Sequence, residues 1–180
     1  MSTSRSAASV STRPSQKRAD NMGPSPGIYA RNCSVRRIDK SVAAAFLDAN
    51  HRLGDTGSRY RYGLFVERST GKGEAEIPGG TLVAVATFSN ARRWLKDGVK
   101  ISSYEWVRYA SLPELRVIGG MGKLLNAFID DVGPDDIMSY ADAAQQDGGE
   151  AYRRLGFVEE CTVEGEGYRN IKFRLRPARK

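Results

Sequence analysis

The stretch Arg116-Val-Ile-Gly119-Gly120-Met121-Gly122-Lys123-Leu124-Leu125 places a glycine-rich turn between an extended segment and an amphipathic helix. Glycines lack a Cβ atom, so the backbone can approach a ligand closely, and a helix N-terminus carries a partial positive charge that suits a pyrophosphate. Lys123 would add charge there or face solvent. The stretch has neither the GK[ST] ending of a Walker loop nor the glycine spacing of a Rossmann fingerprint. A phosphate-binding turn and tight helix packing both fit it.

The residues on either side of this turn predict a sheet flanked by helices. After the turn, Met121, Leu124, Leu125, Phe128 and Ile129 recur at helical spacing until Gly133 and Pro134 end the helix. An earlier helix is predicted from Asp39 or Ser41 to about Asn50, with an inner face of Val42, Ala45, Phe46 and Ala49. Strands are predicted at residues 33–38, 60–67, 81–88, 101–109, 137–141, 158–163 and 168–175, and a short helix at 150–155. This order predicts a fold that combines helices and strands (α/β in the broad sense, here α+β), with a mixed sheet.

Charge is distributed unevenly along the chain, which has 180 residues and a formal charge of +7. Residues 1–40 hold eight basic and two acidic side chains, residues 161–180 hold six and two, and residues 41–160 hold fourteen and seventeen. The basic ends therefore predict contact with nucleic acid or another anionic partner through the termini.

Composition also predicts the domain organisation. Residues 1–26 are rich in serine and arginine and lack apolar periodicity, which predicts a disordered basic tail, with an organelle transit segment as the alternative. A single folded domain is predicted at 27–176, followed by a short basic end at 177–180. No apolar run approaches the roughly 20 residues that span a bilayer. We therefore expect no membrane contact and an intracellular, cytoplasmic protein, with a mitochondrion or plastid as the alternative. Cys33 and Cys161 form no metal-binding motif, so no metal is expected.

Two motifs resemble a known family. Arg116-x-x-Gly119-x-Met121 followed by Leu124-Leu125 resembles the acyl-CoA-binding motif of the GCN5-related N-acetyltransferases, which have Gly or Ala where this chain has Met121. Tyr152-Arg-Arg-Leu155-Gly156-Phe157 resembles the Y-x-x-L-G-F segment near the end of that fold. The resemblance implies an acetyltransferase-like, mostly antiparallel sheet, and a Tyr152 that protonates the departing CoA thiolate or else packs on the sheet. It also implies that acetyl-CoA or a related acyl-CoA binds at Arg116, Gly119, Gly120, Met121, Gly122 and Lys123.

A narrower resemblance, to the phage Mom-type DNA-modification proteins and related acetyltransferase-like domains, covers most of residues 46–157. Segments that agree with it in order and approximate spacing include Asn50-His51-Arg-Leu-Gly54, Trp106-Val-Arg108-Tyr109 and Ser139-Tyr140-Ala141-Asp142. This resemblance implies that the functional residues are His51, Arg108, Asp142 and Tyr152. Residues 143–149 differ from the longer Arg/Trp/Ser/Asn-rich stretch of those relatives.

The same residues can be judged by their chemistry. His51 is the single histidine of the chain, and its ordinary pKa near 6.5 suits proton transfer, although a loop histidine can simply be solvated. Asp142 follows a predicted buried strand and would orient a histidine, accept an amine proton or cap the next turn. Arg108, expected on the same strand face as Trp106, needs either Asp142 or an anionic ligand as a partner. Glu105 is a further candidate base, or a surface carboxylate.

Two functions follow from these residues. The first is an acyl-CoA-dependent acyltransferase acting on a nucleic-acid base or another amine, with Tyr152 as the acid, His51 or Asp142 as the base, and Arg108 orienting the substrate. The second is a catalytically inactive acetyltransferase-like domain that serves as a structural or RNA-binding component of a ribonucleoprotein.

Overall fold

The computed structural model describes residues 26–73, 76–145 and 147–178. The predicted tail at 1–26 lies outside the described residues apart from Pro26, as do the last two residues of the predicted basic end. The helices are α1 (Lys40–Asn50), α2 (Gly120–Val132) and α3 (Glu150–Arg154), and a 3-10 turn, η1, spans Ala30–Asn32. The strands are β1 (Gly27–Tyr29), β2 (Cys33–Arg37), β3 (Tyr60–Val66), β4 (Leu82–Phe88), β5 (Arg92–Lys96), β6 (Val99–Ser111), β7 (Arg116–Ile118), β8 (Asp136–Asp142), β9 (Val158–Gly165) and β10 (Tyr168–Leu175).

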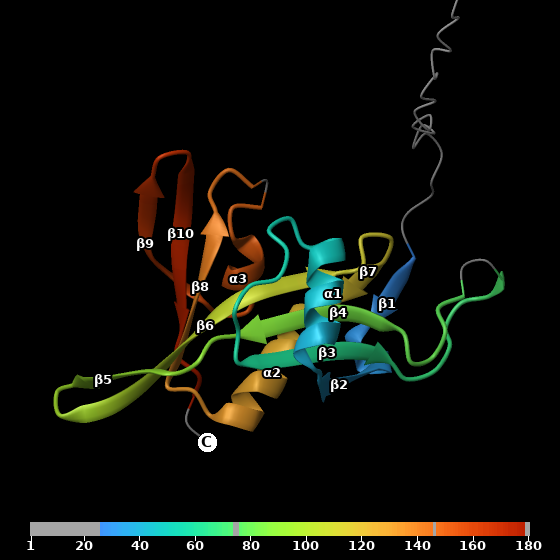
Figure 1. The fold of residues 1–180 in the computed structure, drawn as a ribbon, viewed down its shortest axis with the longest axis horizontal. Helices are drawn as coiled ribbons and strands as arrows, with labels where there is room; N and C mark the ends of the chain where they lie inside the picture. Colours follow the sequence, from blue (N-terminus) through green and yellow to red (C-terminus); the bar gives the residue numbers. More distant parts are fainter. Residues whose placement is uncertain (1–25, 74–75, 146, 179–180) are drawn as a thin grey trace, which may run out of the picture.

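The main sheet has the strand order β2-β3-β4-β6-β8-β10-β9, and β5 pairs with the extended start of β6 (Figure 1). Strands β6 and β8 run parallel, because β7 and α2 form the crossover between them, whereas the other neighbours in this sheet are antiparallel. Strands β1 and β7 form a separate parallel pair. The prediction of a mixed, mostly antiparallel sheet flanked by helices is therefore confirmed.

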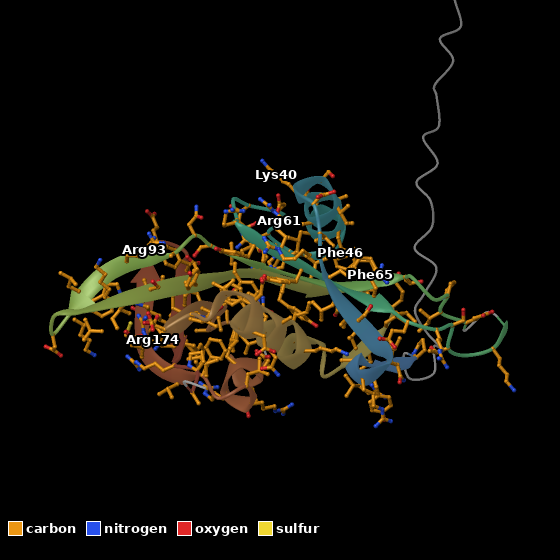
Figure 2. All side chains as sticks on the ribbon, turned by 90° about the horizontal axis from the view of Figure 1, so that it is seen from below. Lys40, Phe46, Arg61, Phe65, Arg93 and Arg174 are labelled. Carbon is orange, nitrogen blue, oxygen red and sulfur yellow. The ribbon has the colours of Figure 1, made fainter. Side chains whose placement is uncertain are left out.

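Phe128 of α2 organises the larger core. Its ring stacks on Phe88 with the centroids 3.9 Å apart, and its edges meet the rings of Tyr60, Tyr62 and Tyr104. Helices α2 and α3 cover this face of the sheet, while α1 lies on the opposite face (Figure 2). The sheet is thus buried on both sides at its centre. No helix within the described residues is both long and apolar enough to cross a membrane.

The inner face predicted for α1 was correct at Phe46 and wrong at Val42, Ala45 and Ala49, which are exposed. Ala43, Phe46 and Leu47 are buried against Val85 and Ala110 of the sheet, whereas Val42 is 41% exposed. The segment is rich in alanine, so both sets of residues satisfy helical spacing. The two larger buried side chains, Phe46 and Leu47, determine which face packs on the sheet.

The sequence-based prediction also missed strand β5. This strand and the start of β6 form a hairpin that projects from one end of the sheet (Figure 1). Its turn consists of Asp97 and Gly98, whose φ angles of 50° and 77° are those of a type I′ turn.

Candidate functional site

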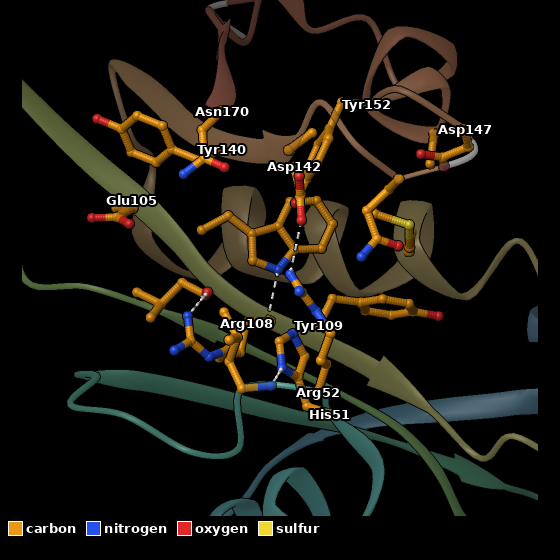
Figure 3. A pocket seen from close by; sticks show the side chains of 17 residues that line it. His51, Arg52, Glu105, Arg108, Tyr109, Tyr140, Asp142, Asp147, Tyr152 and Asn170 are labelled. Carbon is orange, nitrogen blue, oxygen red and sulfur yellow. Dashed lines mark hydrogen bonds and ion pairs between the residues drawn. The ribbon is translucent and has the colours of Figure 1, made fainter. Parts of the chain in front are cut away.

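Strands β6 and β8 are paired for a short distance and then diverge. Their register joins Ser103 to Asp136, Tyr104 to Ile137 and Glu105 to Met138. Beyond this point a cavity of about 800 Å³ opens between the strands, lined by Glu105 to Tyr109 from β6 and by Tyr140 to Asp142 from β8 (Figure 3). The loop after α1 and the segment around α3 complete its walls. Candidates from four separate parts of the sequence meet here: His51, Arg108, Asp142 and Tyr152.

A β-bulge in β6 shapes the cavity wall. Thr87 of β4 pairs with Arg108 and Phe88 pairs with Trp106, so Val107 is an extra residue without a partner in the β4–β6 register. Cross-strand partners point to the same face, and Thr87 and Phe88 point to opposite faces. Arg108 therefore lies on the other face of the sheet from Trp106. The prediction that they share a face was wrong, because strict alternation fails at a bulge.

Arg108 does not form an ion pair with Asp142, which was one of the two partners expected for it. Its guanidinium donates to two backbone carbonyls, those of Gly54 (Nε, 3.0 Å) and Val107 (Nη1, 3.0 Å). Asp142 instead pairs with Arg52, whose Nη2 lies 3.1 Å from Oδ2. Figure 3 shows Arg52 reaching from the loop after α1 toward Asp142. Sequence reasoning missed Arg52, and its position beside His51 was the available signal.

His51 is held in a definite tautomer. The backbone N–H of Leu53 donates to its Nδ1 at 3.0 Å, so in the neutral ring the proton lies on Nε2. Neutral His51 can therefore donate through Nε2, but it has no free nitrogen lone pair to accept an amine proton. Desolvation, together with the nearby cations Arg108 and Arg52, lowers the pKa of His51 below its ordinary value of 6.5. The ring is thus neutral at pH 7 and suited to donating a hydrogen bond.

The depressed pKa of His51 predicts that the free energy of unfolding depends on pH. Between the depressed pKa of folded His51 and about 6.5, the unfolded chain binds more protons, so the free energy of unfolding falls as the pH falls through this window. The chain has one histidine, so its ring proton signals in NMR spectra are unambiguous. We expect the titration midpoint in the folded protein to lie below that in denaturant. The Arg52→Ala variant should raise this midpoint by removing one cation. A folded midpoint at or above the denatured one would contradict this electrostatic description.

Tyr152 lies at the base of the cavity in an aromatic setting. Its ring contacts Trp106, Phe157 and Phe173, and its hydroxyl lies 2.9 Å from Oγ of Ser139. Ser139 Oγ also lies 3.2 Å from the carbonyl oxygen of Trp106. A serine has one hydroxyl proton, and donating it to the Tyr152 oxygen orients the phenol and leaves the phenol proton free for another acceptor. Burial raises the pKa of Tyr152, and the hydrogen bond to Ser139 lowers it by less, so the phenol keeps its proton at neutral pH.

Glu105 contributes a carboxylate to the cavity wall, opposite the side occupied by Tyr109 and Asp147 (Figure 3). Its backbone N–H donates to Ser89 Oγ at 2.9 Å, which fixes this point of β6 beside the bulge. Within the described part of the chain, its carboxylate forms no hydrogen bond or ion pair. By contrast, Asp142 is occupied at both oxygens, because Oδ1 accepts the N–H of Ala144 at 2.9 Å. Among the described carboxylates that line this cavity, Glu105 is thus the one with neither oxygen engaged, since Oδ1 of Asp147 accepts the N–H of Gly149 at 3.0 Å.

The glycine-rich turn forms the N-terminus of α2. Gly119 precedes the helix with a φ of 79°, a conformation that favours glycine, and no side chain among the described residues caps the helix. The first intrahelical bond runs from the N–H of Lys123 to the carbonyl of Gly119 (3.1 Å), so the N–H groups of Gly120, Met121 and Gly122 point out of the helix end. Met121 lines the cavity. The turn therefore presents donors beside the cavity, as an anion site requires.

The other predicted cofactor-binding residues lie elsewhere. Lys123 donates from Nζ to the carbonyls of Ala30 and Cys33, and so ties α2 to η1 and to the first residue of β2. The side chain of Arg116 lies beside Gly27 of β1. Neither residue lines the cavity, so the positive character of this end of α2 comes from its backbone rather than from Lys123. Among the described residues, no group of three or more His, Cys, Asp and Glu side chains is placed to hold a metal ion.

Comparisons with known proteins bear on the fold. No family model and no curated relative matches the sequence. Among solved structures, NAA60 of Arabidopsis thaliana in complex with acetyl-CoA matches with a TM-score of 0.60 and 13% identity, over 80% of this chain and 98% of that one. A GNAT family acetyltransferase of Elizabethkingia anophelis with acetyl-CoA bound matches with a TM-score of 0.52 and 11% identity (81% and 99% coverage). The spermidine/spermine N-acetyltransferase SpeG of Vibrio cholerae matches with a TM-score of 0.55 and 10% identity (82% and 94%). The fold of this chain is therefore that of the GCN5-related N-acetyltransferases.

Proposed function

We propose that this protein is an acyl-CoA-dependent N-acyltransferase. The observation that carries the proposal is the open cavity between the diverging ends of β6 and β8, with a protonated Tyr152 at its base and the uncapped N-terminus of α2 beside it. The fold supports this reading, because NAA60 and the Elizabethkingia anophelis protein, which share it, were crystallised with acetyl-CoA.

The residues present fit an acyl-CoA. The N–H groups of Gly120, Met121 and Gly122 would donate to its pyrophosphate, and Gly122 leaves the approach to them free of a side chain. A Cβ atom added at Gly122 would already lie 3.4 Å from Leu155, so a larger residue would narrow the space between α2 and the segment after α3. When bound, acyl-CoA supplies an activated thioester and a thiolate leaving group.

The chain's own residues would manage the protons. We assign Glu105 as the base that accepts the proton of the acceptor amine as the new C–N bond forms. Tyr152 gives its proton to the sulfur as the C–S bond breaks, and Ser139 orients the phenol for this transfer. His51 donates from Nε2 and so orients the acceptor rather than deprotonating it. Asp142 holds Arg52 and the turn at Ala144 in place.

The acceptor that we propose is an amine, and the finer proposal is the exocyclic amino group of a nucleic-acid base. The resemblance to Mom-type proteins supports the finer proposal, as do the cationic residues Arg52 and Arg108 at the cavity wall. An inactive domain that binds RNA is the second candidate. It is favoured by Met121, whose side chain lines the cavity where the acyltransferase motif has Gly or Ala.

Binding of acetyl-CoA tests the proposal directly. By isothermal titration calorimetry we expect the parent protein to bind acetyl-CoA, and the Gly122→Asp variant to bind at least about tenfold more weakly, because its carboxylate repels the pyrophosphate. Position 122 is preferred to 120, where a Cβ atom would lie 2.8 Å from Val117 and disturb the packing.

The matched control is Gly122→Asn, which has nearly the same shape without the charge and should lose less affinity. An aspartate in the first turn of a helix is favourable, so Gly122→Asp should remain folded. If the parent protein fails to bind acetyl-CoA, or if all three proteins bind equally, the acyltransferase proposal is wrong and the inactive-domain candidate replaces it.

A further inference from the structure

The β5–β6 hairpin exposes both apolar and cationic side chains. Every residue of β5 is exposed, and Trp94, Leu95 and Val99 are 45%, 66% and 53% accessible. The indole of Trp94 is anchored at one edge, where Nε1 donates to Ser103 Oγ at 3.1 Å. A large aromatic side chain held rigidly on a projecting ribbon indicates a binding partner.

The charge of the hairpin indicates which kind of partner. Its two strands carry Arg92, Arg93, Lys96 and Lys100, while its turn carries a single carboxylate, Asp97. Asp135 lies near the base of the hairpin, where its side chain accepts the N–H of Ser102 at 2.8 Å. The excess of cations along the ribbon favours an anionic partner.

A basic pocket lies between the end of β2, the start of α1 and the start of β3. It has a volume of about 300 Å³ and is lined by Arg37, Ile38, Asp39, Lys40, Arg59 and Arg61. Its position is fixed by Arg59, whose backbone N–H donates to the carbonyl of Phe88 (2.8 Å), at the end of the strand that leads into the hairpin.

The cations of this pocket differ in how far they are already neutralised. Arg37 pairs with Asp131 at 3.1 Å, and Arg61 donates to the carbonyl of Ser58 at 2.7 Å. Within the described residues, Lys40 and Arg59 form no ion pair, and Arg59 instead lies over the ring of Tyr60. Figure 2 shows Lys40 and Arg61 near the α1 side of the sheet. The lining holds four cations and one carboxylate, Asp39, so the recess keeps a net positive charge.

We propose that the hairpin and this pocket together bind a single-stranded nucleic acid. The pocket holds a backbone phosphate between Lys40 and Arg59, the cations of the hairpin follow the backbone, and Trp94 stacks on a base. Guanidinium and ammonium groups suit phosphate, and aromatic side chains stack on any base. A recess with room for a phosphate favours a flexible strand over a flat array of lipid headgroups.

This binding surface goes beyond the proposed function and does not depend on it. Helix α1 connects the two sites: Lys40, its first residue, lines the pocket, and His51, just after its last residue, lines the cavity. At 1.5 Å per residue, the helix separates them by about 16 Å. A strand bound at the pocket can therefore reach the cavity within a few nucleotides, but an inactive domain would bind it equally well.

The test is fluorescence anisotropy of a labelled single-stranded oligonucleotide, titrated with the full chain at several salt concentrations. We expect the Lys40→Ala/Arg59→Ala variant to bind roughly tenfold more weakly, with the slope of log K against log salt reduced by about 0.7 for each lost phosphate contact. Trp94→Ala should also weaken binding roughly tenfold while leaving the salt slope unchanged, and Trp94→Phe should restore most of the affinity.

The matched control is Arg68→Ala/Lys72→Ala, which removes two cations from the exposed loop between β3 and β4 and should bind like the parent. Circular dichroism checks that each variant is folded. The proposal is overturned if the parent does not bind the oligonucleotide, or if the control weakens binding as much as the pocket variant does. It is also overturned if these variants affect only sedimentation with vesicles containing phosphatidylserine, which would assign the surface to membranes. Loss of acetyl-CoA binding in Gly122→Asp with unchanged oligonucleotide binding separates this proposal from the proposed function.

Discussion

Replacing Tyr152 by phenylalanine is expected to lower kcat for acyl transfer roughly 10²- to 10⁴-fold, the usual contribution of a general acid. The ring would keep its contacts with Trp106, Phe157 and Phe173, so the change removes the hydroxyl and little else. Burial raises the pKa of Tyr152 above its ordinary value of 10. Deprotonation of this phenol should therefore not reduce the rate at any pH below about 10. Release of free CoA from acetyl-CoA, followed with the best acceptor from a panel of amines and oligonucleotides, gives the rate.

The control for this experiment is Tyr140→Phe. Tyr140 also lines the cavity and is 38% exposed, but it comes from β8 and lies beside Glu105 rather than at the base (Figure 3). It should retain nearly the full rate. Acetyl-CoA binding should survive in both variants, because the proposed pyrophosphate contacts come from α2. A Tyr152→Phe variant as active as the parent would show that this tyrosine packs against the sheet and does not act as an acid.

The elements that sequence predicted well are those with a one-sided hydrophobic pattern. Helix α2 ends at Val132 with the predicted Gly133 as its C-cap, and Leu124, Leu125 and Phe128 are buried, because a wide apolar stripe can face only the sheet. Strand β5 was missed for the opposite reason. Both of its faces are exposed, so Arg92 to Lys96 show no alternation of polar and apolar residues. The Asp97-Gly98 pair was the local signal that could have revealed the hairpin.

The candidate site was predictable as a set of residues but not as a set of contacts. Motif positions identified Tyr152, Asp142, Arg108 and His51, which the fold gathers around one cavity. Their partners depend on the bulge at Val107, which turns Arg108 to the other face of the sheet. An inserted residue in a strand leaves no mark on composition or spacing, so the pairing of Asp142 with Arg52 could not be derived from the sequence.

The stability of this site should depend on a residue that lies outside it. We expect Phe128→Ala to lower the free energy of unfolding by about 3–5 kcal/mol, the usual cost of removing a buried phenyl ring. Phe128 is fully buried at the meeting point of four aromatic rings, so its loss leaves a cavity that neither α2 nor the sheet can fill by a small shift. Urea unfolding followed by circular dichroism gives the free energy, and the midpoint temperature should fall by roughly 10 °C.

Phe65→Ala is the matched control for Phe128→Ala. Phe65 is a half-buried phenylalanine of β3 whose ring meets the Arg36 guanidinium, so its removal should cost clearly less. The effect of Phe128→Ala should also reach the cavity. Phe88, which stacks on Phe128, stacks in turn on Trp106 with the centroids 5.3 Å apart, and Trp106 contacts Tyr152. We therefore expect weaker acetyl-CoA binding in Phe128→Ala even at temperatures where it is folded. If the two variants are equally stable, the aromatic cluster is not the centre of the core. If Phe128→Ala is destabilised but binds acetyl-CoA like the parent, the cavity is positioned by the strands alone.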